Sequence, residues 1–125
     1  MLIVVLATFL ATASPFDGGG NVALYEIANA ANTAPIEGVC LSACTMRLST
    51  AACVDRHAEL GFHAARQAGD GVVSALGTAE VAAHYRPGLR AWFYAGDISR
   101  LRVLRGVQLA RFGYRLCPSS QEGRR

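Results

Sequence analysis

Segments with the composition of short strands alternate with segments of helical periodicity along this chain, and that alternation constrains the fold more than any other feature. A glycine-rich turn at residues 17–20 precedes a helix predicted for residues 21–34, which Pro35 ends. A short strand, interrupted by Gly38, is predicted for residues 36–40. Strands that alternate with helices favour an α/β fold, here a small, mainly parallel sheet flanked by helices.

The predicted helix at residues 21–34 has a capping residue and an apolar face. Asn21 can cap the first turn through its side chain. Residues spaced by three or four positions lie on the same side of a helix. The core-facing stripe predicted in this way consists of Ala23, Ile27, Ala30 and Ala34.

A second turn links the strand predicted at residues 36–40 to another helix. Small residues surround Ser42, which we expect at or near the start of this helix. Short strand pieces at residues 53–54 and 60–63 are predicted next, on either side of a polar turn. Ser42 would therefore follow one strand directly, and the second strand piece would end at His63.

Three further helices are predicted for the second half of the chain. Thr78 can cap the first, Pro87 fits the first turn of the second, and Gly113 ends the third, which Asp97 or Ser99 would cap. The three predicted ranges are residues 79–86, 88–95 and 101–112.

The composition is that of one folded domain. Hydrophobic residues make up 52% of the chain and charged residues 17%, which excludes an intrinsically disordered tail. No apolar run reaches twenty residues, so we expect no stable membrane span. We expect a single domain over residues 14–125, after a possible signal peptide.

The first thirteen residues have two interpretations. Residues 1–10 are nearly all apolar, and residues 11–13 form an A-x-A site of the kind that signal peptidase cleaves. This pattern favours a signal peptide at residues 1–13 and a periplasmic or secreted protein. The alternative is that residues 1–10 form a buried strand, because strands of a parallel sheet also read as continuous apolar runs.

The charge balance argues for an ordinary solvated surface. The net charge is +3, and every cationic side chain is an arginine. The third of the chain from Arg86 onward is basic, but its arginines alternate with Leu, Val and Phe at helix-like spacing. A solvated helix face explains that spacing, so we expect no nucleic-acid partner.

Four cysteines favour an oxidising compartment. They form an even set, as disulfide-bonded proteins have, and allow three complete pairings. Their spacing is not a common zinc pattern, so we expect no metal. A bridge from Cys40 or Cys44, which flank Ser42, would hold the turn rigid, and Cys117 would tie the tail to the core. The disulfide candidates are Cys40, Cys44, Cys53 and Cys117.

Three features supply what a serine hydrolase needs. Such an enzyme requires a hydroxyl nucleophile, a histidine within about 3–4 Å to take its proton, and N–H donors for the oxyanion. Ser42 at a helix start and His63 at a strand end supply the first two. The glycines at residues 18–20 supply backbone N–H groups with no side chain in the way.

In this arrangement the chain resembles the ClpP/crotonase superfamily, in particular its periplasmic or secreted ClpP-like branch. The matching segments are residues 19–22 (GGNV), 40–45 (CLSACT) and 58–63 (AELGFH). The resemblance covers roughly residues 18–63. It implies that Ser42 is the nucleophile and His63 the base. The oxyanion donors it implies are the backbone N–H groups of Gly19, Gly20 and Ala43.

ClpP-like proteases also have an aspartate that orients the histidine. Asp97 is our choice for that residue among the downstream acids, and a Ser–His dyad without an acid is the alternative. The resemblance implies a serine hydrolase, a peptidase without a cofactor, that acts on a peptide or protein and forms a homo-oligomer. The alternative is a non-catalytic secreted module of the same fold that binds a peptide or protein partner. In that case Ser42 would be a helix N-cap and His63 a core histidine.

Overall fold

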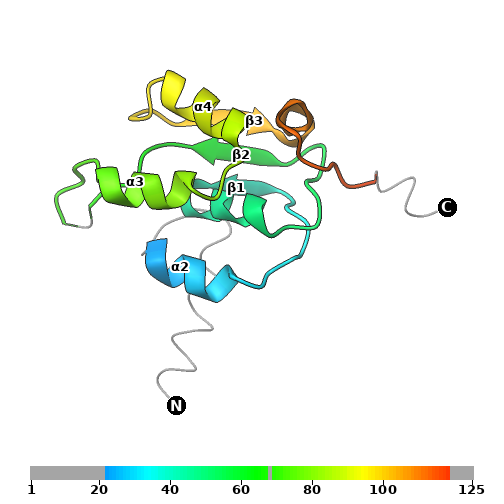
Figure 1. The fold of residues 1–125 in the computed structure, drawn as a ribbon, viewed down its shortest axis with the longest axis horizontal. Coiled ribbons are helices and arrows are strands. Elements are labelled where there is room, and N and C mark those ends of the chain that lie inside the picture. Colours follow the sequence, from blue (N-terminus) through cyan, green and yellow to red (C-terminus); the bar gives the residue numbers. More distant parts are fainter. Residues whose placement is uncertain (1–21, 68, 119–125) are drawn as a thin grey trace, which may run out of the picture.

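A computed structural model describes residues 22–67 and 69–118 as a small α/β protein (Figure 1). The helix α2 lies on the β1 side of the molecule and α4 lies on the β3 side. Two of the helices, η1 and η2, are of the tighter 3₁₀ type. In chain order the elements are α2 (Val22–Asn29), β1 (Val39–Leu41), η1 (Ser42–Ser49), β2 (Glu59–Phe62), α3 (Ala75–Ala82), α4 (Pro87–Ala95), β3 (Arg102–Arg105) and η2 (Gly106–Phe112).

The three strands form one mixed sheet in the order β1-β2-β3. β1 and β2 run parallel, with Leu41 opposite Gly61, whereas β3 runs antiparallel to β2, with Leu104 opposite Leu60. The α/β class is confirmed, but the sheet is mixed rather than mainly parallel. The parallel pair exists because η1 carries the chain back between β1 and β2, as a crossover must. The helices α3 and α4 connect β2 to β3, and the chain then runs through β3 in the direction opposite to β2.

The first helix is shorter than predicted and turns a different face to the core. α2 ends at Asn29, and Tyr25 is its buried residue, whereas Ile27 of the predicted stripe is 74% exposed. A turn ends the helix early, because Asn32 donates its backbone N–H to the Asn29 carbonyl and its side-chain amide to the Asn29 side chain. Asparagine side chains compete with the helical backbone in this way.

The helix predicted for residues 101–112 is wrong in its first half. Residues Arg102–Arg105 form β3, where Leu104 is buried against β2 and Val103 is half exposed, the alternation of a strand. Gly106 then passes so close to Asp55 that a Cβ atom there would meet the Asp55 carbonyl oxygen at 1.7 Å. The remaining half forms η2, which ends as predicted at Gly113 with φ 93°.

Of the helices predicted for residues 79–86 and 88–95, the second is close to its predicted range, whereas the first lies four residues nearer the N-terminus. α4 begins at Pro87, as expected. α3 begins earlier than predicted, and its cap is Ser74, whose hydroxyl accepts a hydrogen bond from the Gly77 N–H. Thr78 is instead buried within the helix, where its hydroxyl donates to the Ser74 carbonyl and accepts from the Ala65 N–H.

An aromatic cluster fills the core between β2 and α4. Phe62 is fully buried, and its ring packs edge-on against Tyr85 at 5.5 Å and Trp92 at 5.6 Å between centroids. Phe93 is buried against Tyr85, whereas Tyr94 is 47% exposed. The aromatic run of α4 is therefore mainly core.

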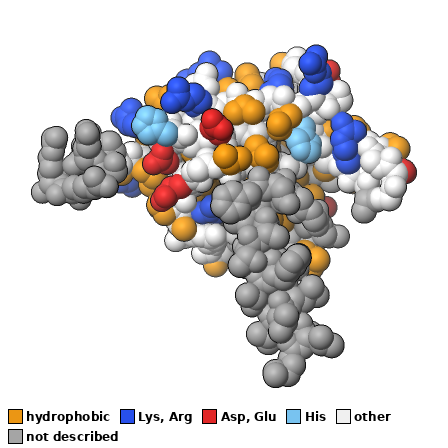
Figure 2. Space-filling view, turned by 180° about the vertical axis from the view of Figure 1, so that it is seen from behind, with side chains coloured by type: hydrophobic (Ala, Val, Ile, Leu, Met, Phe, Trp, Pro, Cys, Tyr) orange, Lys and Arg blue, Asp and Glu red, His pale blue; other side chains and the backbone are white. Residues whose placement is uncertain are grey.

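Several arginines pack against the protein's own aromatic rings. The Arg102 guanidinium lies 4.1 Å from the centroid of Trp92 and donates to the Phe93 carbonyl, and Arg86 lies over the Tyr114 ring. Figure 2 shows basic side chains at several separate places on one face, among hydrophobic and acidic ones. Arg102 lies in a strand, so the predicted solvated helix face does not describe its part of the chain.

Two disulfides, Cys40–Cys44 and Cys53–Cys117, use all four cysteines. The first spans four residues around Ser42, and the second ties the tail to the core, as expected. Both fit a secreted protein. Within residues 22–67 and 69–118, no helix is long and apolar enough to cross a membrane. The predicted signal peptide at residues 1–13 lies outside the described residues.

Candidate functional site

Ser42 and His63 lie at the same edge of the sheet. Ser42 follows β1 directly, His63 follows β2 directly, and the two strands are parallel neighbours in register at Leu41 and Gly61. Both side chains are half-buried. The structure therefore brings the two residues to the carboxyl ends of adjacent parallel strands.

The backbone of Ser42 has an uncommon conformation. Among the described residues it is the one non-glycine residue with a positive φ, at 55°. Such a conformation costs about 1–3 kcal/mol in a non-glycine residue and often marks a functional site. Ser42 is the first residue of η1, and the N-cap position is held by Leu41 without a side-chain hydrogen bond. The alternative that Ser42 is a helix N-cap is therefore wrong.

A buried chain of hydrogen bonds supports this turn. The Thr45 hydroxyl donates to the Ser42 carbonyl oxygen at 2.6 Å, and the Tyr85 hydroxyl lies 2.6 Å from the Thr45 oxygen. Since the single Thr45 hydrogen is used on Ser42, the Tyr85 hydroxyl is the donor of the second bond. Burial raises the pKa of Tyr85 far above its ordinary value of 10, so Tyr85 keeps its donor hydrogen.

Removal of the Thr45 hydroxyl should cost more stability than removal of the Tyr85 hydroxyl. Thr45→Val is expected to lower the free energy of unfolding by about 1–3 kcal/mol, because it leaves the buried Tyr85 hydroxyl without an acceptor. Tyr85→Phe removes donor and hydroxyl together and should cost about 1 kcal/mol. Urea unfolding of both variants checks the order, and an equal or larger loss in Tyr85→Phe would contradict it.

The ring of His63 is held by a backbone carbonyl. Its Nδ1 lies 2.7 Å from the Ala64 carbonyl oxygen. Because a carbonyl only accepts, Nδ1 carries the hydrogen and Nε2 keeps a lone pair, the tautomer that a general base needs. Ala64 is fixed in turn by its N–H, which donates to the Ile98 carbonyl at 2.7 Å. In the described part of the chain, no hydrogen bond joins the Ser42 hydroxyl to His63.

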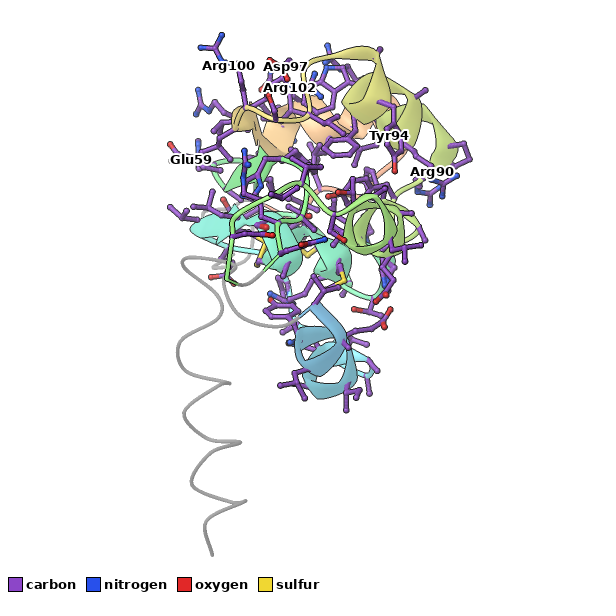
Figure 3. All side chains as sticks on the ribbon, turned by 90° about the vertical axis from the view of Figure 1, so that its left-hand side faces the viewer. Glu59, Arg90, Tyr94, Asp97, Arg100 and Arg102 are labelled. Atoms are coloured by element: carbon purple, nitrogen blue, oxygen red, sulfur yellow. A yellow bond between two sulfur atoms is a disulfide. The ribbon has the colours of Figure 1, made fainter. Side chains whose placement is uncertain are left out.

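Asp97 lies next to Ile98, in the loop that holds Ala64. Its carboxylate accepts hydrogen bonds from the Ser99 hydroxyl and the Ser99 N–H, and these bonds lower the pKa of Asp97, with smaller contributions from Arg100 and Arg102. Figure 3 shows Asp97 close to both arginines. Asp97 is exposed and has no hydrogen bond to His63, so its role as third residue stays a prediction.

The oxyanion donors are placed only in part. Ala43 is buried as the second residue of η1, where a backbone N–H has no partner inside its helix. Gly19 and Gly20 lie outside the described residues. Within the described ranges no group of three His, Cys, Asp or Glu side chains is arranged to hold a metal ion.

Sequence reasoning missed a second group of polar side chains. His84 belongs to no recognisable motif in the sequence, but its Nδ1 lies 2.9 Å from the Ser49 hydroxyl and its Nε2 lies 2.6 Å from a Glu26 carboxylate oxygen. The group borders a cavity of about 320 Å³. Ser49 and Glu26 lie 35 and 58 positions from His84 in the sequence, so no local motif indicates this group.

Comparison with known proteins leaves the family open. Neither a protein-family model, nor a curated protein, nor a solved structure matches the chain. The function is therefore argued from the chain's own residues and from the resemblance of its motifs.

Proposed function

We propose that this protein is a ClpP-like serine hydrolase, a peptidase that acts through Ser42 and His63. The observation that carries the proposal is the positive φ of Ser42 at the end of β1, beside a histidine at the end of the parallel strand β2. A serine in a strained turn between a strand and a helix is exposed to attack a bound carbonyl. The Cys40–Cys44 disulfide supports the proposal, because it holds both sides of that turn.

The proposed reaction forms and hydrolyses an acyl-enzyme. The Ser42 oxygen attacks the peptide carbonyl carbon while His63 Nε2 takes the hydroxyl proton, which then goes to the leaving amine. The Ala43 N–H, and by resemblance those of Gly19 and Gly20, stabilise the oxyanion. Water then attacks acyl-Ser42 while His63 Nε2 takes one of its protons, and the acid product leaves as His63 returns that proton to the Ser42 oxygen. No cofactor takes part in this scheme.

The reaction requires the Ser42 hydroxyl and His63 Nε2 to come within hydrogen-bond distance. Such contacts are often long without substrate and tighten when it binds. The Ala64 carbonyl keeps the ring in the correct tautomer, and Asp97, in the loop that positions Ala64, is the proposed acid. We further propose that the enzyme works in the periplasm or outside the cell and forms a homo-oligomer.

One observation favours a second function. The Ser42 hydroxyl and His63 share no hydrogen bond in the described residues, which is what a non-catalytic module would show. In that case the same edge of the sheet binds a peptide or protein partner without cleaving it.

Fluorophosphonate labelling of the oxidised protein separates the two functions. We expect one adduct at Ser42 that is lost in Ser42→Ala and in His63→Gln, because an unactivated serine does not react. Trypsin cleaves after Arg47, so Ser42 is read in the peptide that ends there after reduction. Absence of an adduct on Ser42, in a sample shown to be folded by circular dichroism, would support the binding module.

A further inference from the structure

The hydrogen bonds of His84 have the connectivity of a catalytic triad. Glu26 on α2 accepts from His84 Nε2, because an ionised carboxylate only accepts. The other nitrogen, Nδ1, then carries the lone pair and faces the Ser49 hydroxyl at 2.9 Å. The Ser49 hydroxyl donates to the Met46 carbonyl at 2.9 Å, so it must turn its hydrogen toward Nδ1 when it acts as a nucleophile. Three elements far apart in the sequence thus meet in one Ser–His–Glu arrangement.

This group is accessible to a ligand. Ser49 is exposed, and the side chains of His84 and Glu26 are 22% and 42% exposed. All three line the cavity of about 320 Å³. Its remaining walls are mostly apolar, with Tyr25, Ala30 and Met46 among them.

The wall of the cavity includes an arginine that has a buried, unpaired N–H group. Arg47 lines it, and Arg47 Nε is buried without a hydrogen-bond partner, although the guanidinium donates to the Ala34 carbonyl through a terminal nitrogen. A buried N–H without a partner is uncommon and costs about 1–3 kcal/mol. Because Nε is buried, Arg47 offers an anion in the cavity the positive charge of its guanidinium rather than a hydrogen bond from Nε.

We propose that Ser49, His84 and Glu26 form a second nucleophilic site, which hydrolyses small carboxylic esters. The Ser49 oxygen attacks the ester carbonyl as its proton passes to His84 Nδ1. The alcohol leaves with that proton. Water then attacks acyl-Ser49 while Nδ1 takes one of its protons, and the carboxylic acid leaves as Nδ1 returns that proton to the Ser49 oxygen. Glu26 holds the ring and stabilises the imidazolium, and the positive charge of Arg47 favours the oxyanion.

The size of the cavity favours a short ester over a peptide. A volume of about 320 Å³ is at the small end of the range for ligand sites, roughly 300–1,000 Å³. Such a space holds a short acyl chain against its apolar wall. A peptidase needs a groove for an extended chain, which a cavity of this size does not offer.

Labelling by a fluorophosphonate tests the site separately from Ser42. Because trypsin cleaves after Arg47 and Arg56, Ser49 is read in residues 48–56 and Ser42 in the preceding peptide. We expect an adduct on residues 48–56 that disappears in Ser49→Ala and His84→Gln and falls at least tenfold in Glu26→Gln. The peptides with Ser74 and Ser99 should stay unlabelled and are the internal controls.

Hydrolysis of p-nitrophenyl butyrate gives the second readout. The assay is run in the full-length Ser42→Ala background, so that Ser42 contributes nothing, and adding Ser49→Ala should remove at least 90% of the remaining activity. Circular dichroism of each variant shows whether it is folded. An adduct on Ser42 alone would overturn the second site and leave the proposed peptidase standing. An adduct on residues 48–56 that survives His84→Gln would overturn the triad, and unlabelled serines throughout would overturn both sites.

Discussion

Removal of the Cys53–Cys117 disulfide by the double substitution Cys53→Ser and Cys117→Ser is expected to lower the free energy of unfolding by about 4 kcal/mol. The bridge closes a loop of 64 residues, and the entropy that a cross-link removes from the unfolded chain grows with the size of the loop. Backbone hydrogen bonds beside it, from the Cys117 N–H to Val54 and from the Val54 N–H to Arg115, depend on the same tether. Urea unfolding of the variant measures the loss.

The Cys40–Cys44 disulfide is the matched control for that experiment. It spans four residues, so its removal should cost about 2 kcal/mol by the same entropy argument. Its removal should have the larger effect on labelling, because Cys40 and Cys44 lie on either side of Ser42. The Cys40→Ser, Cys44→Ser variant should lose most of the Ser42 adduct while still folded. A greater stability loss from this pair than from Cys53–Cys117 would contradict the prediction.

Local signals in the sequence predicted the parts of the candidate site that depend on short segments. Small residues around Ser42 predicted a strand-to-helix turn, and η1 does begin at Ser42. Pro87 and Gly113 mark a helix start and a helix end for the same reason, since each restricts or requires one backbone conformation. These features follow from a few neighbouring residues and need no tertiary contact.

The sequence-based predictions are wrong where tertiary contacts determine the secondary structure. The pattern of residues 101–112 as a whole suits a helix, but pairing with β2 makes Arg102–Arg105 a strand. Nothing in the local sequence indicates the role of Gly106. Its N–H donates to the Ala58 carbonyl, and its lack of a Cβ atom makes room for the Asp55 backbone. A parallel or antiparallel pairing is likewise a property of the connections, which the composition of each strand does not encode.

The polar group around His84 is hidden from sequence reasoning for a related reason. Glu26, Ser49 and His84 are each ordinary surface residues in their own segments. Packing of α2 and η1 against the end of α3 places them within hydrogen-bond distance. By contrast, Ser42 and His63 lie in segments that resemble a known motif, and that resemblance made them visible.

Truncation of Phe62 is expected to have an effect as large as loss of the long disulfide. Phe62→Ala should lower the free energy of unfolding by about 3–5 kcal/mol, because the side chain is fully buried and its removal leaves a cavity. The loss includes the edge-on ring contacts with Tyr85 and Trp92, which join β2 to the helical layer. Thermal and urea unfolding, with both disulfides intact, measure it.

Two substitutions separate cavity formation from the loss of apolar surface in general. Leu76→Ala removes an apolar side chain that is 83% exposed and should change the free energy of unfolding by less than about 0.5 kcal/mol. Phe62→Leu keeps much of the volume and should recover at least half of the stability that Phe62→Ala loses. A loss below about 2 kcal/mol in Phe62→Ala would show that the core can close around the missing ring. The strand end that positions His63 would then rest on the sheet hydrogen bonds rather than on this aromatic cluster.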